Sequence, residues 1–161
     1  MKYFTRGMAN GELDDAECER ITAADHAHIA AIRPTLPPDF SAIVDLQLHD
    51  GLVDRIRWNP TQRHLSMTLV STGPGDLSLT VRIDYEGALL GQQRVDALRR
   101  AATSRETCIL DHEVDRDGEL LVHRYLFWPN EEVAIDCSAV RVTVELRSSA
   151  AISLPGAFVE E

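Results

Sequence analysis

The side chains best suited to chemistry gather between residues 111 and 125. They are carboxylates, imidazoles, a guanidinium and a phenol: Asp111, His112, Glu113, Asp115, His123, Arg124 and Tyr125. If the chain is extended here, successive side chains point to opposite faces, so His112 lies on the apolar face and the carboxylates lie on the other. A tight turn at Asp117-Gly118 then brings His112 and His123 onto one face, directly opposite or one pair apart.

Two interpretations of this histidine pair are open. Two imidazoles with a nearby carboxylate are typical ligands of a Zn²⁺ or Fe²⁺ site. However, no His-x-His or His-Glu-x-x-His spacing is present, and a histidine on an apolar strand face commonly forms hydrogen bonds within the core. We expect no metal and no cofactor, and the alternative is a small-molecule or metal site near His49, His112 and His123.

The His49-Asp50 step is a second candidate, because a neighbouring carboxylate can fix the tautomer of an imidazole and raise its basicity. Asp50-Gly51 also fits a tight turn before a strand, in which His49 makes only local contacts. The candidate binding residues are therefore His49, Asp50, His112, Glu113, His123, Arg124 and Trp128. The last of these is an aromatic side chain beside Phe127 and Pro129.

Motifs for nucleophilic or nucleotide chemistry are missing from the sequence. There is no Gly-x-Ser-x-Gly elbow, phosphate-binding P-loop or Gly-x-Gly-x-x-Gly fingerprint. Cys108 and Cys137 fall in apolar strand contexts, where burial raises the pKa of a thiol and makes it inert. We assign no catalytic residue, and the prediction leans toward a protein that is not an enzyme.

Length and charge limit the class of protein. The chain has 161 residues and a formal net charge of −10, which suits one domain and repels nucleic-acid phosphates. No apolar run approaches the roughly 18 residues of a membrane helix, and the first residues do not form a signal peptide. Three widely separated cysteines (Cys18, Cys108 and Cys137) indicate buried free thiols in a reducing cytoplasm.

The N-terminal part, residues 1–47, is predicted to be helical. A stripe of residues at helical spacing predicts a helix from Gly11 to about Ile32, with Asn10 or Asp14 as the cap. The stripe consists of Leu13, Ala16, Ile21, Ala24, His28 and Ala31. Prolines then end this helix, and a short helix capped by Asp39 follows. The acidic first turns are either a solvated helix start or a face for a basic partner: Glu12, Asp14, Asp15, Glu17 and Glu19.

The β-rich part, residues 48–147, contains runs with the alternation of half-buried strands. They are Leu52–Trp58, Leu65–Ser71, Leu77–Tyr85, the two arms of the Asp117-Gly118 hairpin, Glu132–Cys137 and Ala139–Arg147. Residues 93–102 suit a short helix or an irregular crossover. Residues 148–161 are expected to be a tail whose last two residues fray, while Ile152, Leu154 and Phe158 can dock on the sheet. We predict a single α+β domain, 1–161, with one or two N-terminal helices on a mainly antiparallel sheet or open sandwich of about six to seven strands.

Three short motifs resemble an uncharacterised bacterial family. The motifs are the opening Met1–Thr5, the Leu48-His49-Asp50 step before a strand, and Asp84–Ala88. After Arg6 this chain departs from the family pattern, with Gly7–Asn10 where aromatic residues are expected. The resemblance implies a bacterial, cytoplasmic protein of unknown function and supplies no catalytic residues.

Taken together, these features favour a non-enzymatic protein-interaction module with a possible protein partner, similar by analogy only to immunity proteins. Its contact face would be the acidic helix start or the aromatic patch at Trp128. A small-molecule or metal-binding protein is the alternative.

Arg55, Arg57 and Arg82 suggest a basic stripe on one sheet face, which we interpret as solvated charge. We expect neither nucleic-acid nor membrane binding, and the sequence leaves the oligomeric state open.

Overall fold

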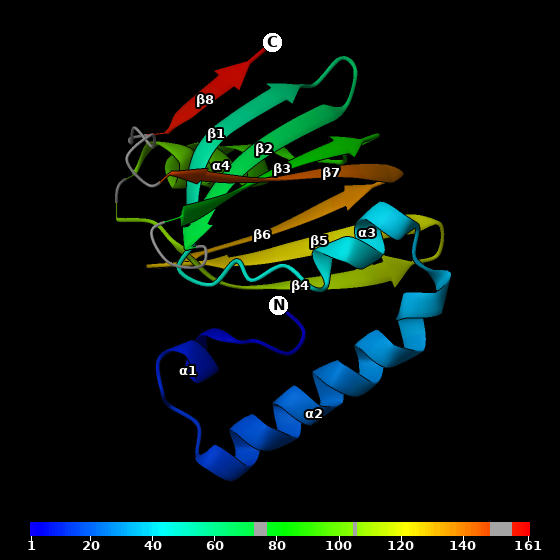
Figure 1. Cartoon of the computed structure of the whole chain (residues 1–161), viewed down its shortest axis with the longest axis vertical. Coiled ribbons are helices and arrows are strands. Elements are labelled where there is room, and N and C mark those ends of the chain that lie inside the picture. The colour runs from blue at the N-terminus through cyan, green and yellow to red at the C-terminus, as the bar shows by residue number, and fades with distance from the viewer. Residues whose placement is uncertain (73–76, 105, 149–155) are drawn as a thin grey trace.

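The computed structural model describes residues 1–72, 77–104, 106–148 and 156–161, and its strands form two sheets (Figure 1). The larger sheet has the strand order β7-β3-β2-β1-β8, and the smaller sheet has the order β4-β5-β6. The larger sheet contains β1 (Leu52–Asn59), β2 (His64–Thr72), β3 (Leu77–Glu86), β7 (Ala139–Ser148) and β8 (Ala157–Glu160). The smaller sheet contains β4 (Ile109–Asp117), β5 (Leu120–Phe127) and β6 (Glu131–Cys137).

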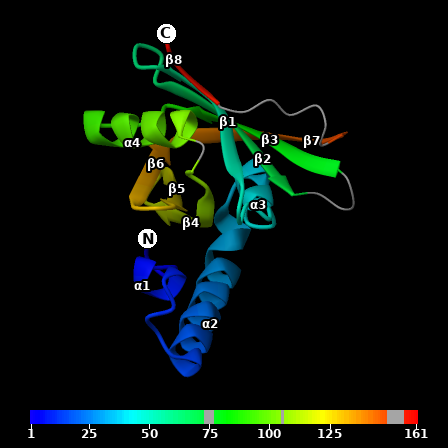
Figure 2. The same cartoon turned by 90° about the vertical axis from the view of Figure 1, so that its left-hand side faces the viewer.

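Helices flank these sheets, so the predicted α+β class is confirmed. They are α1 (Arg6–Ala9), α2 (Asp15–Ile32), a 3₁₀ turn η1 (Arg33–Thr35), α3 (Pro38–Ile43) and α4 (Gln92–Thr103). Of the two alternatives for residues 93–102, the helix is correct. It buries Val95, Leu98 and Ala102 and packs against β1, β6 and β8, where it bridges one end of the two sheets (Figure 2). No helix in the described ranges is long and apolar enough to cross a membrane.

The start of α2 follows from its capping chemistry. Asp14 is extended, and its side chain accepts a 2.8 Å hydrogen bond from the backbone N–H of Glu17. This bond satisfies one of the backbone donors that the first turn of a helix leaves free. The helix therefore begins four residues after Gly11. In α3 the predicted cap is wrong: Asp39 lies inside the first turn, because Pro38 occupies the first helical position, which its fixed φ favours.

Helix α2 packs loosely, although the sequence predicted an apolar stripe along it. None of its residues is buried, and three of the predicted stripe residues are exposed: Ala16, Ala24 and Ala31. Only Ile29 and Ile32, near its C-terminal end, pack against the core. The N-terminal end of α2 lies farthest from the strands in both views (Figures 1 and 2). Most of the helix thus borders the β-structure without being covered by it.

The β4–β5 hairpin has the predicted turn and register. Gly118 has a φ of 59°, which a residue without a Cβ adopts most readily. His112 pairs with Tyr125 and Val114 pairs with His123, so the two histidines are one pair apart on the same face. A register shift between Ile109 and Asp111 bends the start of β4.

The predicted C-terminal tail is wrong in its described part. Residues 157–160 form β8, which runs parallel to β1 and pairs Phe158 with Ile56. The backbone N–H of Glu161 donates to Trp58 O at 2.8 Å, so the predicted fraying of the last two residues is also wrong. Of the three residues expected to dock on the sheet, Phe158 does so and packs against the core, whereas Ile152 and Leu154 lie outside the described residues.

The core lies between the inner faces of the two sheets and is closed by α3 and α4. Strands β1 to β3 contribute side chains such as Ile56, Met67 and Ile83, none of which is exposed. Phe40 and Ile43 of α3 are also fully buried, and each contributes roughly 1.5–3 kcal/mol by leaving water. The polar side chains of Tyr85, His123 and Tyr125 are buried in this same core.

Candidate functional site

A pocket of about 690 Å³ lies between α2, the N-terminal segment, the 44–49 loop and β4. Apolar side chains from all four segments line part of it: Phe4, Ile29, Ala30, Val44, Leu46, Leu48 and Val114. The polar part is formed by Asp25, His26, Arg33, Asp45, Gln47, His49, Asp111, His112 and Glu113. The loose packing of α2 leaves this space open, and ligand pockets typically combine apolar walls with a few polar groups in this way.

Two carboxylates in this pocket are held in a setting that disfavours their charge. Burial, with added repulsion from Glu113, raises the pKa of Asp111 to about 6. Burial and the charge of Glu113 also raise the pKa of Asp25. Within the described residues, neither carboxylate forms an ion pair with lysine or arginine, whereas Arg33 is paired with Asp45. A nearby cation would stabilise the ionised form of both carboxylates.

Histidines surround the carboxylates at different depths. His49 lies at the exposed rim, where its Nδ1 contacts Leu110 O at 2.6 Å. His26, from α2, is exposed at the opposite side of the lining. His112 is deeper and contacts Leu46 O through Nε2 at 3.1 Å.

Behind His112, a chain of hydrogen bonds runs into the core. His112 Nδ1 lies 3.1 Å from His123 Nε2, and His123 Nδ1 lies 2.7 Å from the Tyr85 hydroxyl. The Tyr85 hydroxyl is 2.8 Å from that of Tyr125. Four side chains from β3, β4 and β5 are thus joined in one line between the pocket and the interior.

The carbonyl at the pocket end fixes the direction of this chain. Leu46 O can only accept, so His112 Nε2 donates and Nδ1 accepts from the Nε2–H of His123. Tyr85 then donates to His123 Nδ1, and Tyr125 donates to Tyr85. This arrangement requires both rings to be neutral. Burial lowers the pKa of His112 and lowers that of His123 well below its usual value, in agreement with neutral rings.

The same bonds leave no imidazole nitrogen of this pair for a metal ion. All four ring nitrogens of His112 and His123 have partners, so a metal would have to break the chain. Across the described ranges, no group of three or more His, Cys, Asp or Glu side chains is arranged to hold a metal ion. The histidines meet as the sequence predicted, and their geometry is that of hydrogen-bonded core residues.

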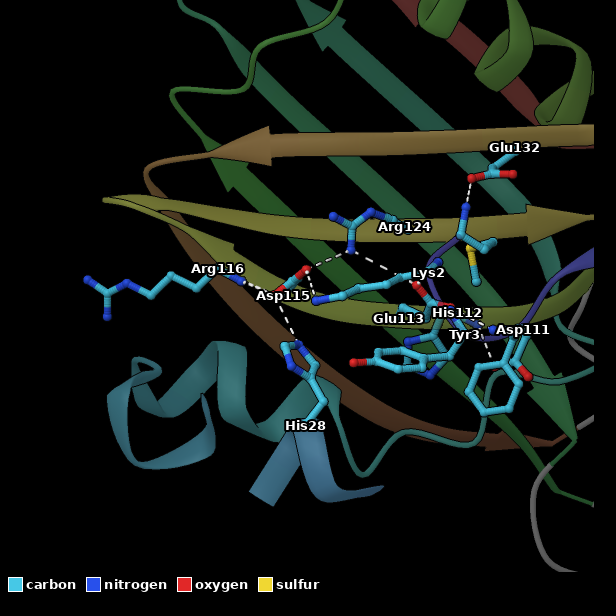
Figure 3. A network of polar contacts seen from close by, with 12 residues as sticks. Lys2, Tyr3, His28, Asp111, His112, Glu113, Asp115, Arg116, Arg124 and Glu132 are labelled. Carbon is cyan, nitrogen blue, oxygen red and sulfur yellow. Dashed lines mark hydrogen bonds and ion pairs between the residues drawn. The ribbon is translucent and has the colours of Figure 1, made fainter. Parts of the chain in front are cut away.

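Glu113 fixes the N-terminal segment to β4. Its carboxylate, only 4% exposed, accepts hydrogen bonds of 2.6–2.7 Å from the backbone N–H groups of Lys2, Tyr3 and Phe4 (Figure 3). Alternation places Glu113 on the face opposite the sheet core, which would be solvated without this segment. Arg6 also donates to the carbonyls of Pro129, Phe127 and Glu131 at the next hairpin.

A second carboxylate on this face, Asp115, connects three elements. It contacts His28 of α2 at 3.0 Å, Arg124 of β5 at 3.2 Å and the Lys2 ammonium at 3.6 Å (Figure 3). Although burial opposes it, the hydrogen bond from Arg116 N–H and the charge of Lys2 lower the pKa of Asp115. Asp115 therefore stays ionised and holds α2 beside β4.

The structure brings together only part of the predicted binding set. His49, His112 and Glu113 line the pocket, and His123 lies directly behind it. Asp50 is at a tight turn with a φ of 59° and does not line the pocket. Arg124 faces Asp115, while Trp128 is 48% exposed at the end of β5 and does not line the pocket either.

Sequence reasoning missed the contributions of other elements to this site. Asp25 and His26 come from α2, Asp45 and Gln47 from the loop before β1, and Tyr85 from β3. No local pattern marks these residues as neighbours of β4. The sequence analysis included Asp111 in the polar cluster. However, the alternation of side chains along the strand assigned it to the solvated face.

The cysteines are free as predicted, but of the three only Cys137 is buried, whereas Cys18 and Cys108 are partly exposed. Cys18, Cys108 and Cys137 are free, and burial raises the pKa of Cys137 to about 12. Burial also raises the pKa of Cys108. Neither strand-region thiol is poised as a nucleophile.

Comparisons with protein-family models, with curated proteins and with solved structures found no match to this chain. The resemblance to an uncharacterised bacterial family therefore stays a prediction, and the function must be argued from the pocket itself.

Proposed function

We propose that this protein binds a small organic cation, such as a primary amine with an apolar body, in the pocket between α2 and β4, without catalysing a reaction. This is the small-molecule alternative of the sequence analysis, now given a ligand class. The observation that carries it is that two partly buried carboxylates, Asp111 and Asp25, line the same pocket and that neither has a lysine or arginine partner among the described residues. Burial raises the pKa of both groups, in agreement with this setting.

Charge and shape support the same ligand class. A bound ammonium near Asp111 and Asp25 would relieve the repulsion that both carboxylates feel from Glu113. The apolar wall, with Ile29 and Leu46, would cover the hydrocarbon part of the ligand. Because His112 uses both ring nitrogens in hydrogen bonds, it offers no free base for catalysis.

The test is ligand-observed NMR with a panel of butylamine, benzylamine and putrescine, followed by calorimetry of any binder at pH 7.5 and pH 5. We expect saturable binding at pH 7.5. Binding should weaken at pH 5, because Asp111 is protonated below a pKa of about 6. Asp111→Asn and Asp25→Asn should each weaken binding about tenfold or more. Asp39→Asn, an exposed carboxylate in α3 outside the pocket lining, is the matched control.

Equal affinity at both pH values, or equal loss with Asp39→Asn, would contradict the proposal. Tighter binding of a neutral analogue such as butanol than of butylamine would contradict it as well. Binding of Mg²⁺ or Zn²⁺ that displaces the amine would indicate a metal-ion site instead.

The exposed indole of Trp128 favours a second candidate, the protein-interaction module that the sequence predicted. At 48% exposure it is a large apolar side chain available to a partner. In a pull-down, a protein retained by the wild-type chain should be lost with Trp128→Ala. It should be kept with Leu89→Ala, a control at a residue that is 39% exposed elsewhere on the surface. If both variants retain the same proteins, Trp128 is not a contact residue. The cytoplasmic location and the bacterial origin stay predictions.

A further inference from the structure

Three arginines meet on the outer face of the larger sheet, away from the pocket between α2 and β4. Arg55 and Arg57 of β1 and Arg82 of β3 line a small depression of about 110 Å³. The hydroxyl residues Ser66 and Thr68 of β2, the strand between them, form the rest of its lining. The sequence suggested a basic stripe here, and the structure adds a hollow shared by its members.

The strand register explains why these side chains converge. Thr68 pairs with Arg55 on one side and with Arg82 on the other, so the three lie in one row across the sheet. Arg57 pairs with Ser66 in the next row, on the same face as Arg55. Directly opposite residues have Cβ atoms about 4.5–5.5 Å apart, which lets two long guanidinium groups reach over the short hydroxyls between them.

The charges in this cluster are unbalanced. Within the described part of the chain, the Arg82 side chain is bound to Asp84 at 3.0 Å, whereas the side chains of Arg55 and Arg57 form no ion pair or hydrogen bond. The whole chain carries a formal net charge of −10, so acidic side chains are plentiful elsewhere. Two guanidinium groups thus remain available beside a third, that of Arg82, whose Nε and Nη2 both bind Asp84 Oδ1.

The size and donor chemistry of the hollow fit a single tetrahedral oxyanion. A volume of about 110 Å³ has room for about four water molecules, at roughly 30 Å³ each. Guanidinium groups bind phosphate oxygens through paired N–H donors, and serine and threonine hydroxyls add further donors. A longer polyanion would also meet the negative charge of the rest of the surface, which opposes its approach.

We propose that the hollow formed by Arg55, Arg57, Arg82, Ser66 and Thr68 binds the phosphate group of a small phosphomonoester or free inorganic phosphate. The site is independent of the amine pocket, because the two share no lining residue. Its ligand is an anion and the other ligand is a cation, so failure of one proposal leaves the other standing.

The test is a ³¹P NMR linewidth titration of inorganic phosphate and of glycerol 3-phosphate with the full chain. Saturable broadening is expected, and sulfate should compete for the site. Arg55→Gln and Arg57→Gln should each weaken binding at least about tenfold, or about 1.4 kcal/mol. Arg55→Lys keeps the charge and loses the paired donors, so its affinity should fall between those of the wild type and Arg55→Gln.

Arg141→Gln is the matched control, because Arg141 lies on the same sheet face in the row of Asp84 but outside the hollow. A loss with Arg141→Gln equal to that with Arg55→Gln would show diffuse charge attraction and overturn the proposal. No saturable binding of either phosphate would also overturn it. Tighter binding of a single-stranded oligodeoxynucleotide than of glycerol 3-phosphate would point to a phosphodiester backbone and contradict a single-phosphate site. The arginines are exposed, so circular dichroism should show each variant folded.

Discussion

One hydroxyl, that of Tyr85, joins the two halves of the buried hydrogen-bond chain. It donates to His123 and accepts from Tyr125, and all three side chains are completely buried. A buried polar group without a partner costs free energy, so the position of this oxygen determines whether its neighbours are tolerated in the core. This free-energy cost depends on single polar atoms, so it can be tested by removing one hydroxyl group.

Tyr85→Phe should lower the free energy of unfolding by about 2–4 kcal/mol, because it leaves His123 Nδ1 and the Tyr125 hydroxyl each without a partner. Urea unfolding followed by circular dichroism would measure the change. Tyr3→Phe is the matched control, since the Tyr3 hydroxyl has no hydrogen bond among the described residues and its loss should change stability by less than about 0.5 kcal/mol. Equal effects of the two substitutions would contradict the assigned chain.

The elements at both ends of the chain are held by contacts with distant strands. Glu113 of β4 binds the backbone of residues 2–4, and β8 adds a parallel strand to the edge of β1. Helix α2 has no fully buried side chain, so besides Ile29 and Ile32 it is held by the contacts of His28 with Asp115 and with Tyr3 of the N-terminal segment. Loss of an anchor should therefore release one segment while the two sheets stay folded.

Glu113→Gln should free the N-terminal segment. A carboxylate accepts with both oxygens, whereas an amide turns one acceptor into a donor that faces a backbone N–H. We expect faster hydrogen exchange of the Lys2, Tyr3 and Phe4 amides, by at least about tenfold, with unchanged protection in β5. Glu119→Gln, an exposed residue beside the turn after β4, should leave all these rates unchanged. Unchanged exchange at residues 2–4 in the Glu113 variant would show that the carboxylate does not hold the segment.

Phe158→Ala tests the attachment of β8. Phe158 packs against the core, and the Arg99 guanidinium lies 4.8 Å from its ring centroid. The substitution should lower the free energy of unfolding by roughly 2 kcal/mol, less than for a fully buried phenylalanine. Val159→Ala removes an exposed side chain from the same strand and should cost less than about 0.5 kcal/mol. Thermal unfolding of both variants would show whether β8 contributes to the fold.

At the scale of the whole molecule, two buried titratable groups change the folding stability in opposite directions as the pH changes. His123 has a folded pKa well below its unfolded value, so the folded state binds fewer protons and loses stability as the pH falls below about 6.5. Asp111 behaves in the opposite way, because its pKa is raised to about 6 in the folded state. Its contribution is fully present below its unfolded pKa of 3.8 and is lost as the pH rises through about 6.

Stability measured between pH 5 and pH 7.5 should therefore fall toward acid, by up to about 1.4 kcal/mol per pH unit for His123, and Asp111 should partly offset this fall. Asp111→Asn removes the opposing contribution. The variant should be more stable than the wild type at pH 7.5, and this advantage should shrink steadily as the pH falls below about 6. Urea unfolding at several pH values would measure both trends. If the difference in the free energy of unfolding between Asp111→Asn and the wild type stays constant with pH, the raised pKa of Asp111 is contradicted.

The sequence by itself determined the elements whose signals are local. Alternating apolar residues predicted β1, β2, β3 and β7, since side chains of a strand alternate between core and solvent. Asp117-Gly118 predicted the β4–β5 turn and hence the meeting of His112 and His123, because the required positive φ suits glycine. Asp14 likewise marked the start of α2 within a few residues.

Only the tertiary structure decided which of those elements face one another. Strand β8 was missed because four residues carry little periodicity and its partner, β1, is about a hundred residues away in the sequence. Glu113 alternates onto an outer face, and its carboxylate is buried only because the backbone of the N-terminal segment covers it. The side chains of that segment do not indicate that its backbone binds a carboxylate. The pocket depends on α2 lying beside β4, and Asp25 and Asp111 become neighbours only through that packing. Their raised pKa values arise from burial and from the nearby charge of Glu113 in three dimensions, which the order of residues along the chain does not encode locally.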